Sequence, residues 1–219
     1  MPVKLIVFDI EIATPIEECS KGWQSYDEMG ISVMCAWEGS EAPMRFFDRL
    51  NILDGIAYLN SADVLGGFNT LNFDLRVLEG TCGRLFPGTD APDLASLRRI
   101  PHLDVLDLLV QSQFGVGIQD ALKVHEGYEV FGGGKKLNHV AKATLGLSKS
   151  STGVEAPQRW QAGRIAEVYD YCARDVWIEW QLVDHVIRRA YVLWGLQGYP
   201  KLAYLTVPEE IASRCTPQT

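Results

Sequence analysis

The sequence predicts an α/β fold in which a mixed β-sheet is flanked by α-helices. Short apolar runs rich in β-branched residues gather in the first half of the 219-residue chain, and the longest helical pattern lies near its end. Helical segments also alternate with some of the strands, which favours a mixed sheet. Because this length suits one substantial core, we expect a single domain over residues 1–208 and a C-terminal tail over 209–219.

Four strands are expected in the first third of the chain. Residues 3–9 form an apolar run suited to a central strand, residues 31–37 suit a second strand, and residues 44–47 suit a third. Apolar residues at helical spacing follow over 50–59. Residues 63–69 predict a fourth strand that runs into a turn softened by two glycines.

From residue 81 onward, the sequence predicts an irregular insertion, two helices and a late strand. Residues 81–101 hold most of the Gly and Pro of the middle region, and the Gly-rich stretch 131–136 predicts a flexible basic loop. A helix is expected over 137–145 and a longer one over 163–190. Residues 199–207 predict one more strand.

Charge and composition narrow the function classes. The formal net charge of −8 disfavours tight non-specific binding to duplex nucleic acid, because phosphate backbones attract basic surfaces. The five cysteines are odd in number and never spaced as CxxC, so we expect reduced thiols in a cytoplasmic protein, without a zinc site. No stretch approaches the roughly 20 uninterrupted apolar residues of a membrane span, so no membrane association is expected.

Three short acidic motifs supply four carboxylates and one tyrosine. Asp9 and Glu11 lie two residues apart on the first expected strand, so their side chains share one face. Asp74 lies where a turn runs into helical spacing. Tyr171 and Asp175 are four residues apart on the long helix and therefore stack on one face, which continues as an apolar line into the protein.

Four carboxylates in one place would bind divalent cations. Hard ions such as Mg²⁺ and Mn²⁺ prefer oxygen ligands, and clustered carboxylates repel one another unless cations lie between them. If the fold brings the motifs together, the simplest use is a two-metal site that cleaves a phosphodiester. Each motif alone also fits a structural role, such as a strand end, a helix N-cap at Asp74 or a core tyrosine at Tyr171. Their joint occurrence favours the site.

In this order, the motifs DxE, NxxxFD and YxxxD resemble those of the DEDDy 3′–5′ exonucleases, which have a ribonuclease H-like fold. The resemblance covers residues 3–190 and is greatest to the proofreading domains of family-B DNA polymerases and their stand-alone relatives. It implies that the four acids bind two Mg²⁺ or Mn²⁺ ions and that Tyr171 positions or deprotonates the attacking water. It also implies that Asn69 and Phe73 hold the 3′-terminal nucleotide. Asp170 stands where the histidine branch of the family has its histidine, so the tyrosine branch is indicated.

The implied reaction is hydrolysis of single-stranded nucleic acid from the 3′ end, with release of 5′-mononucleotides. DNA is the preferred substrate by resemblance, and RNA stays open because no residue identifies a reader of the 2′-hydroxyl. Because no polymerase region follows the residues that carry the resemblance, the enzyme is expected to act alone or with a separate replication or repair protein. One departure concerns residues 12–14, Ile-Ala-Thr, where many relatives have Thr-Thr or Thr-Gly after the Glu.

Three alternatives stay open. The first is a 3′–5′ exoribonuclease of the same fold. The second is a phosphatase of the haloacid-dehalogenase type, whose DxDxT motif the first strand resembles, although that chemistry needs an aspartate where Glu11 stands. The third is a non-catalytic module that keeps the fold to bind nucleic acid or protein, which the presence of all four acids and the tyrosine disfavours.

Overall fold

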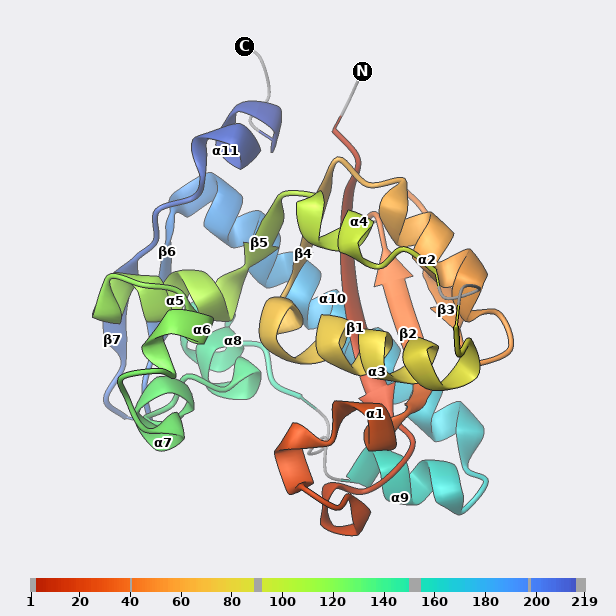
Figure 1. Cartoon of the computed structure of the whole chain (residues 1–219). Helices are drawn as coiled ribbons and strands as arrows, with labels where there is room; N and C mark the ends of the chain where they lie inside the picture. Colours follow the sequence, from red (N-terminus) through yellow and green to blue (C-terminus); the bar gives the residue numbers. More distant parts are fainter. Residues whose placement is uncertain (1–2, 40, 89–91, 150–154, 197, 216–219) are drawn as a thin grey trace.

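A mixed five-stranded sheet forms the centre of the molecule (Figure 1). The computed structural model describes residues 3–39, 41–88, 92–149, 155–196 and 198–215. The strands are β1 (Leu5–Ile12), β2 (Ile31–Trp37), β3 (Arg45–Phe47), β4 (Val64–Gly67) and β5 (His102–Asp104). They lie in the order β3-β2-β1-β4-β5. The pairs among β1, β2 and β3 are antiparallel, whereas β4 and β5 continue the sheet in parallel. This is the ribonuclease H-like arrangement.

Strand β1 is central because its side chains are apolar on both faces. Ile6, Phe8 and Ile10 belong to one apolar cluster, whereas Val7 belongs to the other. Asp9 and Glu11 continue the Val7 face of the strand, as the alternation of side chains requires. The strand runs three residues beyond the predicted range because its pairing with β2 continues to Ile12. Both acids therefore lie within the sheet.

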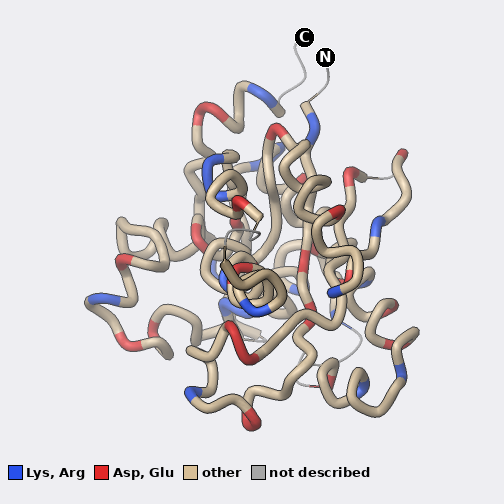
Figure 2. The backbone as a smooth tube through the Cα atoms, turned by 45° about the vertical axis from the view of Figure 1, so that its right-hand side comes forward, with Lys and Arg blue, Asp and Glu red and all other residues tan. Residues whose placement is uncertain are grey.

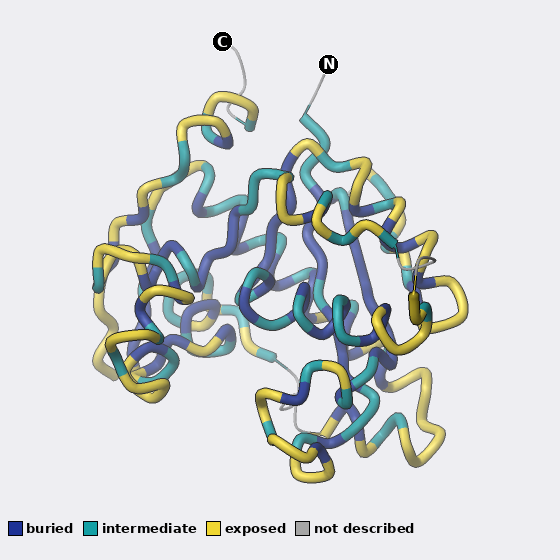
Figure 3. The backbone as a smooth tube through the Cα atoms, viewed as in Figure 1, coloured by how far each residue is buried: buried dark blue, intermediate teal, exposed yellow. Residues whose placement is uncertain are grey.

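Helices cover both faces of the sheet. The long helix α10 (Ile165–Arg189) lies behind the sheet in Figure 1. Buried residues of α5 (Val105–Phe114) and α8 (Leu137–Leu145) belong to the same apolar cluster as those of α10. Helices α2 (Ile52–Asn60) and α3 (Leu75–Leu85) pack on the other face. The sheet and the inner helical faces are buried between these layers (Figure 3).

Shorter elements complete the fold. Between β1 and β2 lie η1 (Ile16–Glu18), η2 (Gly22–Gln24) and α1 (Tyr26–Met29). A π-helical turn η3 (Thr70–Asp74) leads into α3. The remaining helices are α4 (Ala95–Arg99), α6 (Ile118–Ala121), α7 (Gly127–Phe131), α9 (Glu155–Gln161) and α11 (Glu209–Cys215). A separate antiparallel hairpin joins β6 (Tyr191–Trp194) to β7 (Lys201–Tyr204).

The irregular insertion and the late strand differ from the prediction. Residues 81–85 are not irregular, because the buried Thr81 and Cys82 keep them in α3, and α4 forms a second helical turn within the predicted insertion. Residues 89–91 lie outside the described part. The late strand is shorter than predicted and pairs with β6, a strand that the sequence pattern did not reveal.

The Gly-rich stretch 131–136 is not a solvated basic loop. Lys135 is only 4% exposed, and its ammonium donates hydrogen bonds to the carbonyls of Glu129, at 2.6 Å, and Gly132, at 3.3 Å. Gly134 has a φ of 92°, and a Cβ there would lie 2.2 Å from the backbone of Gly195. The glycine is therefore needed for a close backbone approach to the end of β6.

The predicted C-terminal tail is partly helical. Residues 209–215 form α11, and its buried Ile211 belongs to the same apolar cluster as the buried residues of α10. Residues 216–219 lie outside the described part. Acidic and basic positions are interspersed along the chain (Figure 2). Among the described helices, none is both long enough and apolar enough to cross a membrane. The described cysteines are all free thiols, as expected.

Candidate active site

The structure brings six of the seven predicted site residues to one cavity of about 570 Å³. Those that line it are Asp9, Glu11, Asn69, Phe73, Tyr171 and Asp175. They come from β1, from the turn after β4 and from α10, so the cavity lies where the sheet, the turn and the long helix meet. The seventh residue, Asp74, is buried and does not line the cavity.

Asp9 and Glu11 form the sheet side of the cavity. Cys172 of α10 lies against them, with its thiol 3.5 Å from the Asp9 carbonyl and 3.8 Å from Asp9 Oδ2. One ligand atom from each of these three residues can be chosen so that all lie within 4.8 Å of one another. This spacing suits donors that surround one cation.

Asp74 is hydrogen-bonded to the backbone of the same strand. Its Oδ1 accepts a hydrogen bond of 2.9 Å from the backbone N–H of Ile10, which lies between the two acids of β1. Its side chain makes no cap to α3, so the N-cap role is excluded. Burial raises the pKa of Asp74 well above its usual value, and the nearby charge of Asp9 raises it further.

The turn that carries Asn69 is fixed by Asp104, a residue that the sequence analysis missed. Asp104 Oδ1 accepts the N–H of Asn69 at 2.8 Å, and Oδ2 accepts the N–H of Leu71 at 3.0 Å. The same carboxylate caps α5 through the N–H of Leu106, at 3.0 Å. An Asp between a strand and an apolar helical run is an N-cap signal. This signal could have identified the cap on α5 but not the hydrogen bonds from Asp104 to the Asn69 turn.

Asn69 itself has a left-handed backbone, with φ 71° and ψ 19°. Asparagine adopts this conformation more readily than most residues. Its side-chain oxygen is buried and makes no hydrogen bond with the described residues. The hydrogen bonds from Asp104 therefore hold Asn69 at the cavity wall, where its buried side-chain oxygen has no partner among the described residues.

Helix α10 places Tyr171 and Asp175 one turn apart, both buried, as the spacing predicts. Lys149, also missed as a site residue, reaches them from the segment after α8. Its Nζ lies 2.5 Å from Asp175 Oδ2 and 5.3 Å from the centre of the Tyr171 ring. No hydrogen bond of ordinary geometry from the described residues reaches Asp175 Oδ1 or the Tyr171 hydroxyl. Both atoms are buried polar groups without a partner of ordinary geometry among the described residues.

The cavity holds strongly perturbed acids. Burial, and next the charge of Asp175, raises the pKa of Asp9 to about 7, although Lys149 opposes the shift. Burial and the charge of Asp9 raise the pKa of Glu11 well above its usual value. Burial also lowers the pKa of Lys149, but Asp175, Tyr171 and Asp9 outweigh this effect and raise it overall, so the ammonium stays charged.

Glu179 is another buried carboxylate near the site. It lies one turn after Asp175 on the same face of α10, a spacing that could have identified it. Burial, and next the charge of Asp9, raises its pKa well above the usual value. Its Oε2 has no hydrogen-bond partner among the described residues.

The donor set fits divalent cations. Buried acids that raise one another's pKa are relieved when cations lie between them, and hard oxygen donors are what Mg²⁺ and Mn²⁺ prefer. Asp175 Oδ1 and the Tyr171 hydroxyl, both buried without a hydrogen bond of ordinary geometry from the described residues, add to this fit. The residues at the cavity that would hold such ions are Asp9, Glu11 and Asp175, with Asp74 beneath them.

Comparisons with known proteins support the fold. The chain matches no protein-family model and no curated protein sequence. Among solved structures, it is similar to the family B DNA polymerase from the hyperthermophilic archaeon Pyrobaculum calidifontis, with 16% identity and a TM-score of 0.61. The match covers 85% of this chain and 25% of the polymerase chain. At this identity, the similarity establishes a shared α/β fold.

Proposed function

We propose that the protein is a metal-dependent 3′–5′ exonuclease of the DEDDy type that releases 5′-mononucleotides from single-stranded nucleic acid. The observation that carries this proposal is the convergence of Asp9, Glu11, Tyr171 and Asp175 on the cavity that Asn69 and Phe73 also line. The fold shared with a segment of a family B DNA polymerase supports it.

The acids have the role of cation ligands in this proposal. Asp9, Glu11 and Asp175 would hold two divalent ions, Mg²⁺ or Mn²⁺, and Asp74 would complete the set from the η3 turn. When bound, the ions would promote ionisation of the attacking water and neutralise charge on the phosphate. Lys149 keeps a positive charge beside Asp175 and would help to attract the scissile phosphate into an otherwise acidic cavity.

Tyr171 is assigned to orienting the attacking water. Burial and the charge of Asp175 raise the pKa of its phenol above the usual 10, so the hydroxyl stays neutral at physiological pH. A neutral hydroxyl donates and accepts hydrogen bonds but is a poor base. The perturbed pKa therefore favours positioning over deprotonation of the water.

Asn69 and Phe73 are assigned to the 3′-terminal nucleotide. The unpaired Asn69 oxygen can accept a hydrogen bond from the sugar or base, and Phe73 presents an aromatic ring to the same cavity. Single-stranded DNA is the proposed substrate, because stacking and local hydrogen bonds need unpaired nucleotides. A separate replication or repair protein is a proposed partner.

A time course with a 5′-labelled DNA single strand tests the function. In Mn²⁺ or Mg²⁺, the wild type should give a ladder that shortens one nucleotide at a time, whereas Asp9→Asn should give none. A matched RNA strand separates the deoxyribonuclease from the exoribonuclease. Binding without cleavage in either metal would instead favour the non-catalytic module, and turnover of p-nitrophenyl phosphate would favour the phosphatase.

A further inference from the structure

Trp23 is a large aromatic residue that the protein does not use for its core. Its side chain is 62% exposed, it belongs to neither apolar cluster, and it lines the same cavity as the acids. It lies on η2, in the connection between β1 and β2. Exposing so much apolar surface is unfavourable in water, so burying the ring under a ligand would stabilise the complex.

The Trp23 ring meets Phe73 at an angle. The ring centroids are 6.0 Å apart and the planes are inclined by 60°, so the two rings form a corner. Behind this corner, Tyr26 packs edge-on against Phe73, with ring centroids 6.4 Å apart. The guanidinium of Arg76 lies 4.3 Å from the centre of the Tyr26 ring. Phe73 is thus supported from one side and exposed to the cavity on another.

The wall that carries Trp23 is held in place by hydrogen bonds. The buried Ser25 accepts the N–H of Lys21 at 2.8 Å and donates its own N–H to the Gly22 carbonyl at 3.1 Å. From α9, Gln161 donates to Glu18 at 3.1 Å. The ring is therefore presented on an ordered turn.

The side of the cavity that carries Trp23 is negatively charged, which determines the part of a nucleotide that can bind there. Glu17 lines the cavity beside Trp23, and Glu18 follows it in η1. These carboxylates repel a phosphate, but they do not repel an uncharged nucleobase. The basic group of the cavity, Lys149, belongs to the segment after α8 instead. The two sides therefore suit different parts of one nucleotide.

We infer that Trp23 stacks on an unpaired base at the 3′ end of the substrate, in the corner that it forms with Phe73. This inference rests on the proposed exonuclease function and adds a residue that selects single-stranded ends. Every base has an aromatic face, so the contact tolerates any sequence, whereas a base within a duplex cannot enter the corner without unpairing.

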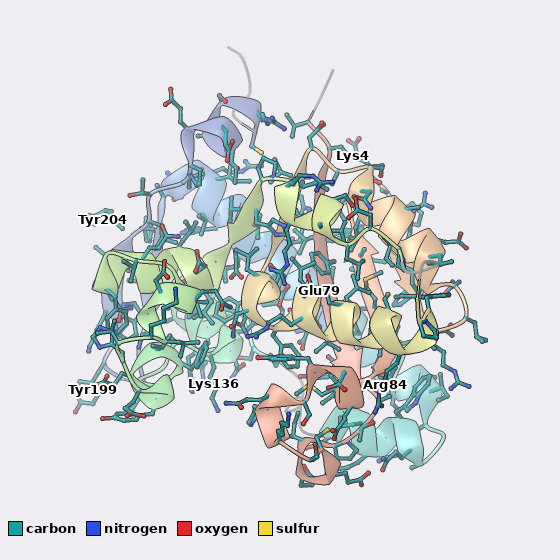
Figure 4. All side chains as sticks on the ribbon, in the orientation of Figure 1. Lys4, Glu79, Arg84, Lys136, Tyr199 and Tyr204 are labelled. Atoms are coloured by element: carbon teal, nitrogen blue, oxygen red, sulfur yellow. The ribbon has the colours of Figure 1, made fainter. Side chains whose placement is uncertain are left out.

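Steady-state kinetics on a single-stranded DNA oligonucleotide provide the test. Trp23→Ala should raise KM by about 5- to 150-fold, the range measured when stacking aromatic residues are removed, with a smaller effect on kcat. Trp23→Phe keeps a stacking ring and should recover most of the loss. Tyr199→Ala is the matched control, because Tyr199 is an exposed aromatic residue (Figure 4) that follows β6 and does not line the cavity. Melting temperatures would confirm that each variant folds.

A substrate change isolates the contact itself. An oligonucleotide whose last two nucleotides are abasic should show a raised KM with the wild type and little further rise with Trp23→Ala. An equal abasic penalty in both proteins, or an unchanged KM in Trp23→Ala, would overturn the inference.

Binding separates this inference from the function on which it rests. The affinity for a fluorescent oligonucleotide is measured in Ca²⁺, another hard ion for oxygen ligands. Trp23-dependent binding by a wild type that never hydrolyses DNA would overturn the exonuclease and support the stacking. Absence of both binding and hydrolysis would overturn both.

Discussion

Lys149 Nζ and Asp175 Oδ2 lie 2.5 Å apart, although 26 residues separate them in the chain. Asp175 is almost completely buried, and the Lys149 side chain is 21% exposed. The ammonium also lies near the Tyr171 ring. This pair therefore places one fixed positive charge among the acids of the cavity.

Lys149→Met should destabilise the metal-free protein. Without the ammonium, Asp175 is a buried charge with no close partner, and removing one member of such a pair costs about 3 kcal/mol. In EDTA the melting temperature should fall, and Mn²⁺ should restore much of it by supplying positive charge. Lys123→Met is the control, because its pair with Asp120 is exposed and should contribute less than about 1 kcal/mol. Equal effects of the two substitutions would contradict this view of Lys149.

Metal-free stability should fall as pH rises. The pKa of Asp9 is about 7 in the folded protein against 3.8 ordinarily, and the pKa of Glu11 is also raised. The folded state then binds more protons than the unfolded state, so the free energy of unfolding decreases as pH rises toward and through about 7. Urea unfolding in EDTA between pH 5 and 8 measures this slope. Asp9→Asn should flatten it, and a slope of opposite sign would refute the assignment.

Divalent cations should stabilise the fold through Asp9. An ion that binds only the native state adds about 2.7 kcal/mol at 100 times its Kd, so Mg²⁺ or Mn²⁺ should raise the melting temperature. Asp9→Asn should blunt that rise. Asp170→Asn removes an exposed carboxylate on α10 that does not line the cavity, and it should leave the rise intact. A full metal-dependent rise in Asp9→Asn would mean that Asp9 is not a principal ligand.

Tyr171→Phe should separate chemistry from metal binding. The change keeps the ring and removes only the hydroxyl that orients the water, so turnover should fall by about 10²- to 10⁴-fold, a loss comparable to that of a catalytic acid or base. The metal-dependent rise in melting temperature should persist. Tyr169→Phe removes a hydroxyl that lies outside the cavity, 3.4 Å from Asp48, and should be nearly silent. A Tyr171→Phe variant with most of its rate would make the tyrosine a core residue.

Periodicity was sufficient to predict the parts of the site that lie within one element. Alternation along β1 puts Asp9 and Glu11 on one face of the strand, and helical spacing puts Tyr171 one turn before Asp175. The mixed α/β sheet and four of its strands also follow from the order of apolar runs and helical patterns, but β5 was not predicted, and the predicted late strand pairs outside this sheet. These features depend only on the periodicity of a single strand or helix, which can be read from the spacing of the residues.

The remaining site features depend on contacts between distant segments. Asp104 binds the Asn69 turn across 35 residues, and no periodic pattern marks that pairing. Lys149 follows the end of α8 in a segment without a helical or strand pattern. Trp23 lies on a short turn that only the folded chain brings to the edge of Phe73. Such positions are set by packing, which a single sequence does not reveal.

Selective blocking of substrate ends tests the central claim most directly. Two otherwise identical single-stranded DNA oligonucleotides, one blocked at the 3′ end and one at the 5′ end, are incubated with the wild type and Mn²⁺. The proposed function predicts that the 5′-blocked strand is degraded to 5′-mononucleotides while the 3′-blocked strand stays intact. Degradation of the 3′-blocked strand with protection of the 5′-blocked strand would contradict it.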